Sequence, residues 1–269
     1  MEYRRLGSSG LEVSVVCLGT MMFGDRTYAA QANEIAAHAF ANGINFIDTA
    51  DVNAKTPLAE TVATMGALID AGKIRYFGVS NFRGWRIAEL MHWCERLDVP
   101  PPVVCQPYYN LLNRMPEVEV LAACDYYGIG VASYSPVARG VLTAKYAPGQ
   151  IPDDSRAARK DRRLMQTEFR DESFAIAQTL KHHAERTGRT PVQFALAWLW
   201  ANRIVTSVIA GPRTFAQWTD YVDAIGTPWT AEDEALVDSL VVTGHPSTPG
   251  YNDPQYPIEG RVSRAGQGA

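Results

Sequence analysis

Four side chains in the middle of the chain have the chemistry of a site for a planar, polar ligand. Ser80, Asn81 and Gln106 carry hydroxyl and amide groups that can hydrogen-bond a carboxamide, and each follows a short apolar stretch. Tyr134 ends another such stretch and offers a ring on which a heteroaromatic group can stack. The alternative for Ser80 and Asn81 is that they only cap the helix after them.

A second group of residues, near position 211, has the chemistry of a phosphate site. Gly211 follows an apolar stretch and precedes a predicted helix, so its surroundings leave backbone N–H groups that can point at an anion. Arg213 lies in the first turn of that helix and can pair with a phosphate through two parallel hydrogen bonds. Taken alone, Arg213 could equally be a surface arginine.

The elements that must position these residues alternate between short β-branched stretches and longer stretches with helical periodicity. The predicted strands cover residues 13–18, 44–47, 74–79, 103–106, 129–133 and 206–209. The predicted helices cover residues 30–42, 56–71, 86–97, 117–127, 171–187, 190–202, 214–225 and 230–240. This alternation indicates an α/β fold with a parallel sheet, whose ligands bind at the carboxyl ends of the strands. No strand is followed by the Gly-x-Gly-x-x-Gly fingerprint of classical dinucleotide sites.

Composition narrows the class of protein further. With 25 Lys and Arg against 29 Asp and Glu, the chain lacks the strongly basic character of nucleic-acid-binding proteins. No run of about 18 apolar residues predicts a membrane span. Four widely spaced cysteines, without metal-ligand spacing, are expected as reduced thiols of a cytoplasmic protein that holds no metal; they are Cys17, Cys94, Cys105 and Cys124.

Six motifs, in order along almost the whole chain, resemble those of the aldo-keto reductases. The most specific runs from Ala71 to Phe82, Ala-Gly-Lys-Ile-Arg-Tyr-Phe-Gly-Val-Ser-Asn-Phe. The others are Tyr3–Ser14, Leu18–Met21, Phe46–Ala50, Gln106–Asn110 and Tyr134–Thr143. The resemblance implies a (β/α)8 TIM barrel that reduces aldehydes or ketones with NADP(H), acting on a small carbonyl substrate without nucleic acid or membrane partners.

The same resemblance implies a cofactor site residue by residue. Ser80, Asn81 and Gln106 would hold the nicotinamide carboxamide, and Tyr134 would stack on the nicotinamide ring. The segment from Ser135 to Lys145 would cover the pyrophosphate. Arg213 would bind the 2′-phosphate and Gln217 the adenine side, although Tyr221 stands where the family commonly has Asn. The full implied set is Gly19, Thr20, Met21, Asp48, Ser80, Asn81, Gln106, Tyr134, Ser135, Pro136, Gly140, Leu142, Lys145, Gly211, Arg213 and Gln217.

The catalytic half of the site departs from the family. The resemblance implies a tetrad of Asp, Tyr, Lys and His, in which the Tyr protonates the carbonyl oxygen. Asp48 matches the Asp, but Asn53 occupies the position of the Tyr and cannot act as a general acid. The Lys and His belong to the ends of the third and fourth strands, and the sequence passes from Ala54 directly to what resembles the fourth helix.

The chain is therefore expected to lack two strand–helix units, roughly 60 to 70 residues. It would form a single barrel domain over 1–269, with two strands in 1–53, the remainder in 54–241 and a substrate-loop tail in 242–269. The gap could reflect residues absent from this sequence, a genuine deletion, or a six-stranded relative. A barrel opened in this way must recruit a partner as an oligomer, reclose with a different stagger, or be unstable.

Two functions remain open on these residues. The first is an aldo-keto reductase with an impaired site; the second is a catalytically silent nucleotide-binding or regulatory protein of the same fold. Lys55, Tyr108, Tyr109 and His245 are the residues that could replace a lost catalytic group. For each of them a solvated loop position or a packing role is the simpler expectation. The substrate is not encoded in any motif.

Overall fold

Six parallel strands form the central sheet of this protein, in the order β4-β3-β8-β7-β6-β5. The computed structural model describes residues 1–23, 27–48, 57–147, 149, 151–153 and 155–256. The strands are β3 Val16–Gly19, β4 Ile47–Asp48, β5 Gly78–Ser80, β6 Val104–Gln106, β7 Gly130–Tyr134 and β8 Val205–Ala210. Each pairing between neighbours is parallel, as the alternation in the sequence predicted.

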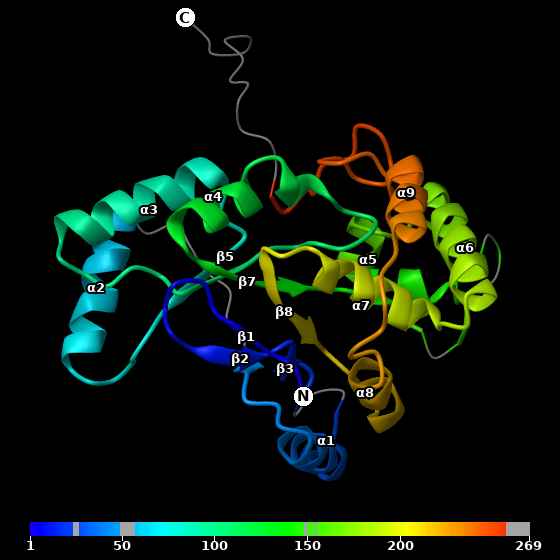
Figure 1. Cartoon of the computed structure of the whole chain (residues 1–269), viewed down its shortest axis with the longest axis horizontal. Helices are drawn as coiled ribbons and strands as arrows, with labels where there is room; N and C mark the ends of the chain where they lie inside the picture. The colour runs from blue at the N-terminus through cyan, green and yellow to red at the C-terminus, as the bar shows by residue number, and fades with distance from the viewer. Residues whose placement is uncertain (24–26, 49–56, 148, 150, 154, 257–269) are drawn as a thin grey trace, which may run out of the picture.

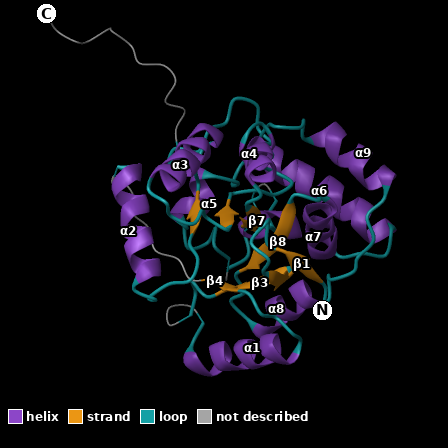
Figure 2. Cartoon of the chain, turned by 60° about the vertical axis from the view of Figure 1, so that its left-hand side comes forward, coloured by secondary structure: helices purple, strands orange, loops and turns teal. Residues whose placement is uncertain are grey.

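Helices surround the strands on the outside of the curled sheet (Figure 2). They are α1 Ala29–Ala41, α2 Leu58–Asp70, α3 Gly84–Arg96, α4 Val120–Tyr127, α5 Arg162–Gln166, α6 Asp171–Arg186, α7 Pro191–Ala201, α8 Phe215–Val222 and α9 Ala231–Leu240. Two short 3₁₀ helices, η1 Met115–Glu117 and η2 Ala138–Thr143, lie in loops. Thr190 and Thr230 each form a capping box with the residue three positions later, so the start signals of α7 and α9 are confirmed.

An antiparallel hairpin that the sequence did not predict precedes the sheet (Figure 1). Its strands are β1 Tyr3–Arg5 and β2 Glu12–Ser14. The hairpin turn lies against the start of β7, where a Cβ on Gly7 would meet the Gly128 carbonyl oxygen at 2.1 Å. The predicted strand 13–18 is therefore divided between the hairpin and β3. Because the hairpin covers the amino end of β7, the carboxyl ends of the strands are left for a site.

The sheet buries side chains on both of its faces. Alternate residues of β3 show this, because Val16 and Leu18 pack in the main core with the helices while Cys17 packs on the inner face. On that inner face Cys17 joins Ala132 and Ile209, beside the partly buried Phe46, Val104 and Tyr134. All four cysteines are buried free thiols, as predicted, and burial raises the pKa of the Cys17 thiol well above its usual range.

β4 and β5 are the two edge strands of the described sheet. β4 was predicted over 44–47, but only Ile47 and Asp48 pair, with Leu18 and Gly19 of β3. An edge strand has one neighbour to pair with, so less of it is held in register, and Ile47 keeps 47% of its surface exposed. A curled parallel sheet with two free edges is the architecture of a partial barrel.

A buried ion-pair cluster joins α6, α7 and α9 at the outer side of the molecule. Asp233 accepts hydrogen bonds from His183 Nε2 at 2.7 Å and from both terminal nitrogens of Arg189 at 2.8 and 2.6 Å. Burial raises the pKa of the Asp233 carboxyl, but these donors and Thr230 outweigh it and hold that pKa well below its usual range. Asp233 therefore stabilises the fold in its charged form.

Replacing Asp233 by Asn is expected to lower the free energy of unfolding at pH 7 by about 3 kcal/mol, because two buried donors lose their anionic partner. The folded-state pKa is depressed, so this stabilisation is complete above the pKa of the unfolded carboxyl. It is lost as the pH falls toward the folded value. Denaturant unfolding at several pH values measures it. Glu185→Gln, on an exposed pair with Lys181, is the control and should change stability by less than about 0.5 kcal/mol.

Candidate active site

A chain of hydrogen bonds connects the carboxyl ends of β5, β6 and β7. The Ser80 hydroxyl donates to the Gln106 carbonyl oxygen at 2.9 Å, and the Asn81 amide donates to the Ser80 hydroxyl at 2.8 Å. The Tyr134 hydroxyl donates to Asn81 Oδ1 at 2.7 Å. Burial raises the pKa of Tyr134, so its hydroxyl stays protonated at neutral pH. The structure thus brings together the four residues that the sequence singled out.

Asp48 joins this group from the opposite edge of the sheet. Gln106 Nε2 donates to Asp48 Oδ1 at 2.7 Å, although three strands separate β4 from β6 in the sheet order. Burial raises the pKa of Asp48, and the hydrogen bond from Gln106 acts in the opposite direction. The side-chain amide of Gln106 is therefore already bound to a carboxylate of the chain itself.

Residues at the end of β3 hold the backbone of Asp48 in position. Thr20 donates to the Asp48 carbonyl oxygen through its backbone N–H at 3.0 Å and through its hydroxyl at 2.8 Å. Gly19 is packed so closely that a Cβ there would come 2.8 Å from the Ile209 side chain. Met21 is 64% exposed. Thr20 and Gly19 thus position the strand end, and only Met21 of the three presents a large accessible side chain.

The loop after β7 doubles back on itself. Ser135 (φ 55°), Arg139 (φ 52°) and Gly140 (φ 95°) all have left-handed backbone conformations. Such conformations are sparsely populated for residues other than glycine and are frequent at ligand-binding loops. A Cβ on Gly140 would lie 2.9 Å from Lys145 Nζ, so the lysine ammonium lies over the bare glycine backbone. Pro136 and Leu142 are buried and anchor the loop to the core.

The segment after β8 forms a compact turn into α8. The Thr214 hydroxyl accepts from the Gln217 N–H at 3.2 Å, and Gln217 Oε1 accepts from the Arg213 N–H at 2.8 Å. Space is open around Gly211, where a Cβ would meet nothing within 4 Å. Tyr221 is buried in the core and does not face solvent. Gln217 therefore fixes the backbone at the start of α8, beside the open space at Gly211.

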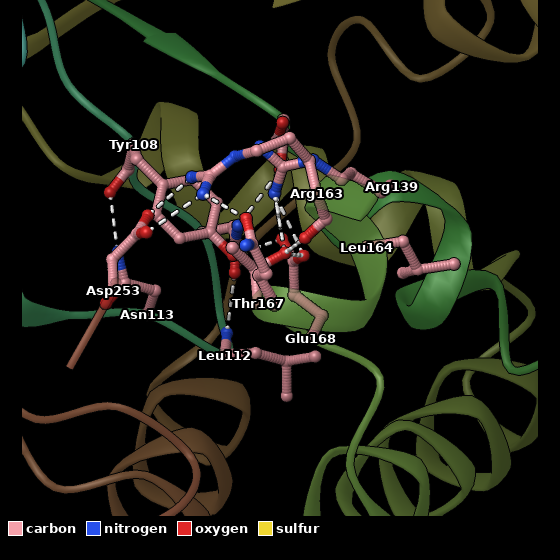
Figure 3. A network of polar contacts seen from close by, with 12 residues as sticks. Tyr108, Leu112, Asn113, Arg139, Arg163, Leu164, Thr167, Glu168 and Asp253 are labelled. Carbon is pink, nitrogen blue, oxygen red and sulfur yellow. Dashed lines mark hydrogen bonds and ion pairs between the residues drawn. The ribbon is translucent and has the colours of Figure 1, made fainter. Parts of the chain in front are cut away.

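Figure 3 shows a buried polar network around Tyr108, Arg139 and Glu168 that the sequence did not predict. Glu168 is fully buried and accepts from the Tyr108 and Thr167 hydroxyls and, at 2.9 Å to each oxygen, from Arg139 Nη1. The Tyr108 ring stacks on Tyr134 with 5.5 Å between ring centroids and 26° between planes. Glu168 lies in the polar segment before α6, where no local pattern indicates its long-range partners.

The described part of the C-terminal segment, residues 242–256, is held by several contacts to earlier parts of the chain. Arg163 forms a two-pronged ion pair with Asp253 at 2.9 and 2.6 Å, and Arg83 donates to the Tyr256 carbonyl oxygen at 3.0 Å. The exposed His245 ring contacts only the Thr243 carbonyl oxygen among the hydrogen bonds of the described chain. Asp253 and Tyr256 therefore attach this segment to Arg163 and Arg83, and His245 is not among the residues gathered around Tyr134.

Tyr108, Tyr109 and Lys55 are the other residues that could replace a lost catalytic group. Tyr109 donates to Glu117 at 2.7 Å and packs on Trp198, on the helical side of the sheet. Tyr108 donates to Glu168, so both hydroxyls are engaged by carboxylates of the chain. Asn53 and Lys55, and with them the position of the family's Tyr, lie outside the described residues.

No group of three or more His, Cys, Asp or Glu side chains among the described residues is arranged to hold a metal ion. None of the described helices combines the length and the apolar character needed to cross a bilayer.

Comparison with known proteins gives the family. The profile of the Aldo/keto reductase family matches in two overlapping segments, residues 15–56 and 51–242. A probable voltage-gated potassium channel subunit beta of Arabidopsis thaliana is 29% identical over 299 positions, covering 84% of this chain and 91% of that protein. The L-glyceraldehyde 3-phosphate reductase of Escherichia coli O157:H7 is 30% identical over 210 positions, covering 75% and 60%. The uncharacterized oxidoreductase YrpG of Bacillus subtilis is 26% identical over 305 positions, covering 84% and 91%. This chain belongs to the aldo/keto reductase family of oxidoreductases.

Proposed function

We propose that this protein binds NADP(H) across the carboxyl ends of β5 to β8. The hydrogen-bonded group of Ser80, Asn81, Gln106 and Tyr134 is the observation that carries the proposal. Its hydroxyl and amide groups suit the nicotinamide carboxamide, and Tyr134 suits the nicotinamide ring. To bind the carboxamide, Gln106 must exchange its hydrogen bond with Asp48 for one with the cofactor.

The phosphate groups of the cofactor fit two places in the chain. In the left-handed loop at Gly140, a side chain would collide with Lys145, so the ammonium group of Lys145 lies over the glycine backbone, and a diphosphate could pair with it there. The open space at Gly211 beside Arg213 and the start of α8 suits the 2′-phosphate of the adenosine. Gln217 contributes by fixing that turn, on the adenine side.

For the reaction, we propose reduction of a small aldehyde or ketone to an alcohol. Bound NADPH supplies the hydride. Asp48, at the end of β4, would lie beside the carbonyl, and the tail segment 242–269 would shape the substrate mouth. Asn53 cannot deliver the proton that the carbonyl oxygen needs, so the chain performs this reaction slowly or not at all.

We further propose that one barrel domain over 1–269 lacks two strand–helix units between β4 and α2. Three observations support this. β4 and β5 are the free edges of the described sheet. The family profile matches in two segments that meet at residues 51–56. The alignment to the Arabidopsis protein needs 299 positions for 84% of a 269-residue chain, which accommodates roughly 60 to 70 residues of two strand–helix units.

A second candidate function is a catalytically silent nucleotide-binding or regulatory protein, located, like the enzyme, in the cytoplasm. The observation in its favour is the name of the Arabidopsis relative, a probable voltage-gated potassium channel subunit beta. That name describes one subunit of a larger assembly. Asn53 at the acid position is compatible with it. Both functions require the cofactor site, so turnover separates them.

Replacing Arg213 by Ala is expected to weaken NADPH binding by about 10- to 100-fold, since charge-assisted hydrogen bonds contribute about 1.5 to 3 kcal/mol. Affinity for NADH, which lacks the 2′-phosphate, should change less than twofold. Quenching of tryptophan fluorescence measures both affinities. Arg203→Ala, an exposed arginine with a distant partner in Asp125, is the control. Equal losses for NADPH and NADH would contradict the assignment of Arg213.

Turnover with a panel of aldehydes is expected to be about 10²- to 10⁴-fold below that of the Escherichia coli relative, the usual contribution of a positioned general acid. The oxidation of NADPH, followed by absorbance, measures it. Turnover equal to the relative would overturn the expectation. If that turnover disappeared in Tyr134→Ala and survived in Asn53→Ala, a different residue would be the proton donor.

The intact mass of the protein purified from its natural source tests the gap. If the gap belongs to the natural protein, the measured mass is 29.6 kDa, that of the sequence described here. A natural mass larger by two strand–helix units would show that the gap does not exist in the working protein. In that case the argument from Asn53 and the lost tetrad would fall.

A further inference from the structure

The tyrosine after β6 is placed where it can control the ring on which the nicotinamide would stack. We propose that Tyr108, held by Glu168 and Arg139, is a positioning residue that fixes the Tyr134 ring for the nicotinamide. This inference rests on the proposed function, since it assigns a role within the proposed cofactor site. The catalytic groups of the family and the stacking residue itself are not part of it.

The rings of Tyr108 and Tyr134 are in direct contact. Tyr108 and Tyr134 form an isolated parallel bridge, and the Tyr134 N–H donates to the Pro107 carbonyl oxygen at 3.1 Å. The shared backbone register places both side chains side by side, with the centroid separation of 5.5 Å and the 26° tilt of an offset stack. Asn81 holds the hydroxyl end of Tyr134 at 2.7 Å. The Tyr134 ring is thus fixed at one face and at its tip.

Glu168 and Arg139 hold Tyr108 in place. Its ring is 8% exposed, and its hydroxyl donates to the fully buried Glu168. The Arg139 guanidinium lies 5.0 Å from the centroid of the same ring and donates to Glu168 as well. A buried carboxylate loses stability when one of its donors leaves, so rotation of Tyr108 away from Tyr134 is disfavoured.

The contacts on the two sides of Tyr108 distinguish a positioning role from ordinary core packing. Arg139 belongs to the loop Ser135–Lys145, whose left-handed backbone is proposed to cover the diphosphate. Tyr108 therefore contacts the ring platform on one side and, through Arg139, the phosphate loop on the other. A role as proton donor is not compatible with this geometry, because the hydroxyl is bound to Glu168 and burial keeps the pKa of Tyr108 well above its usual range.

The test compares two probes that share the adenosine half of the cofactor. NADPH carries the nicotinamide, and 2′,5′-ADP lacks it. Tyr108→Leu is expected to weaken NADPH binding about fivefold and to change 2′,5′-ADP binding less than twofold, because stacked aromatic pairs are worth roughly 1 kcal/mol beyond their burial. The emission of bound NADPH, which reports stacking of the nicotinamide, should also return toward that of free NADPH.

Two further variants make the result decisive. Tyr108→Phe keeps the stacked ring and loses the hydrogen bond to Glu168. Its affinity for NADPH should fall about threefold, and this loss should be confined to NADPH and leave the binding of 2′,5′-ADP unchanged. This variant also decides the question if Tyr108→Leu does not fold. Tyr109→Phe is the matched control, because it removes a similar hydrogen bond to Glu117 from a tyrosine that packs on Trp198.

Three outcomes would overturn the inference. Equal losses for NADPH and 2′,5′-ADP in the Tyr108 variants would show that Tyr108 only supports the fold. Unchanged binding of both probes would show that the Tyr134 ring needs no support. Absence of NADPH binding by the folded wild-type chain would be the failure of the proposed function itself. It can be told apart from a failure of the Tyr108 inference, because the wild-type chain is measured before any residue is replaced.

Discussion

The hydrogen bond between Gln106 and Asp48 is the contact on which the site depends. In a flat sheet the strands β4 and β6 would lie four spacings apart, roughly 19 Å. Their side chains nevertheless meet at 2.7 Å, so the sheet must roll until its ends approach. The same rolling brings the proposed carboxamide group of β5, β6 and β7 to the carboxylate of β4. It also gives the Gln106 amide a partner within the chain, with which a cofactor must compete.

The retained and the lost parts of the site follow from the order of the strands. The proposed cofactor residues belong mainly to β5, β6, β7 and β8, which are contiguous in the sheet, so a break between β4 and β5 leaves their mutual geometry intact. By the family resemblance, the general acid would lie just after β4, where Asn53 stands, and the Lys and His would come from the two strands proposed to be missing. The proposed gap would therefore remove groups that deliver the proton and leave the proposed cofactor residues together.

The parts of the fold that the sequence predicted are those determined by local signals. The helices α7 and α9 begin at Thr190 and Thr230 because a capping box is a contact within four residues. β4 was overestimated because an edge strand is limited by its single neighbour, which no local pattern encodes. The Tyr108–Glu168 and Arg163–Asp253 contacts join residues 60 and 90 positions apart. The sequence shows that these side chains are present, but no local pattern predicts which of them pair.

The residues on the inner face of the sheet are compatible with the proposed gap of two strand–helix units. An eight-stranded barrel needs large branched side chains to fill its interior, and a sheet of six strands encloses less. Here the buried inner layer includes the small residues Cys17 and Ala132 beside Ile209. Above that layer the stacked rings of Tyr108 and Tyr134 close the carboxyl end, with Glu168 and Arg139 neutralising each other around them. Tyr108 and Tyr134 follow or end the neighbouring strands β6 and β7, so one set of contacts packs this side of the sheet and forms the platform proposed for the nicotinamide.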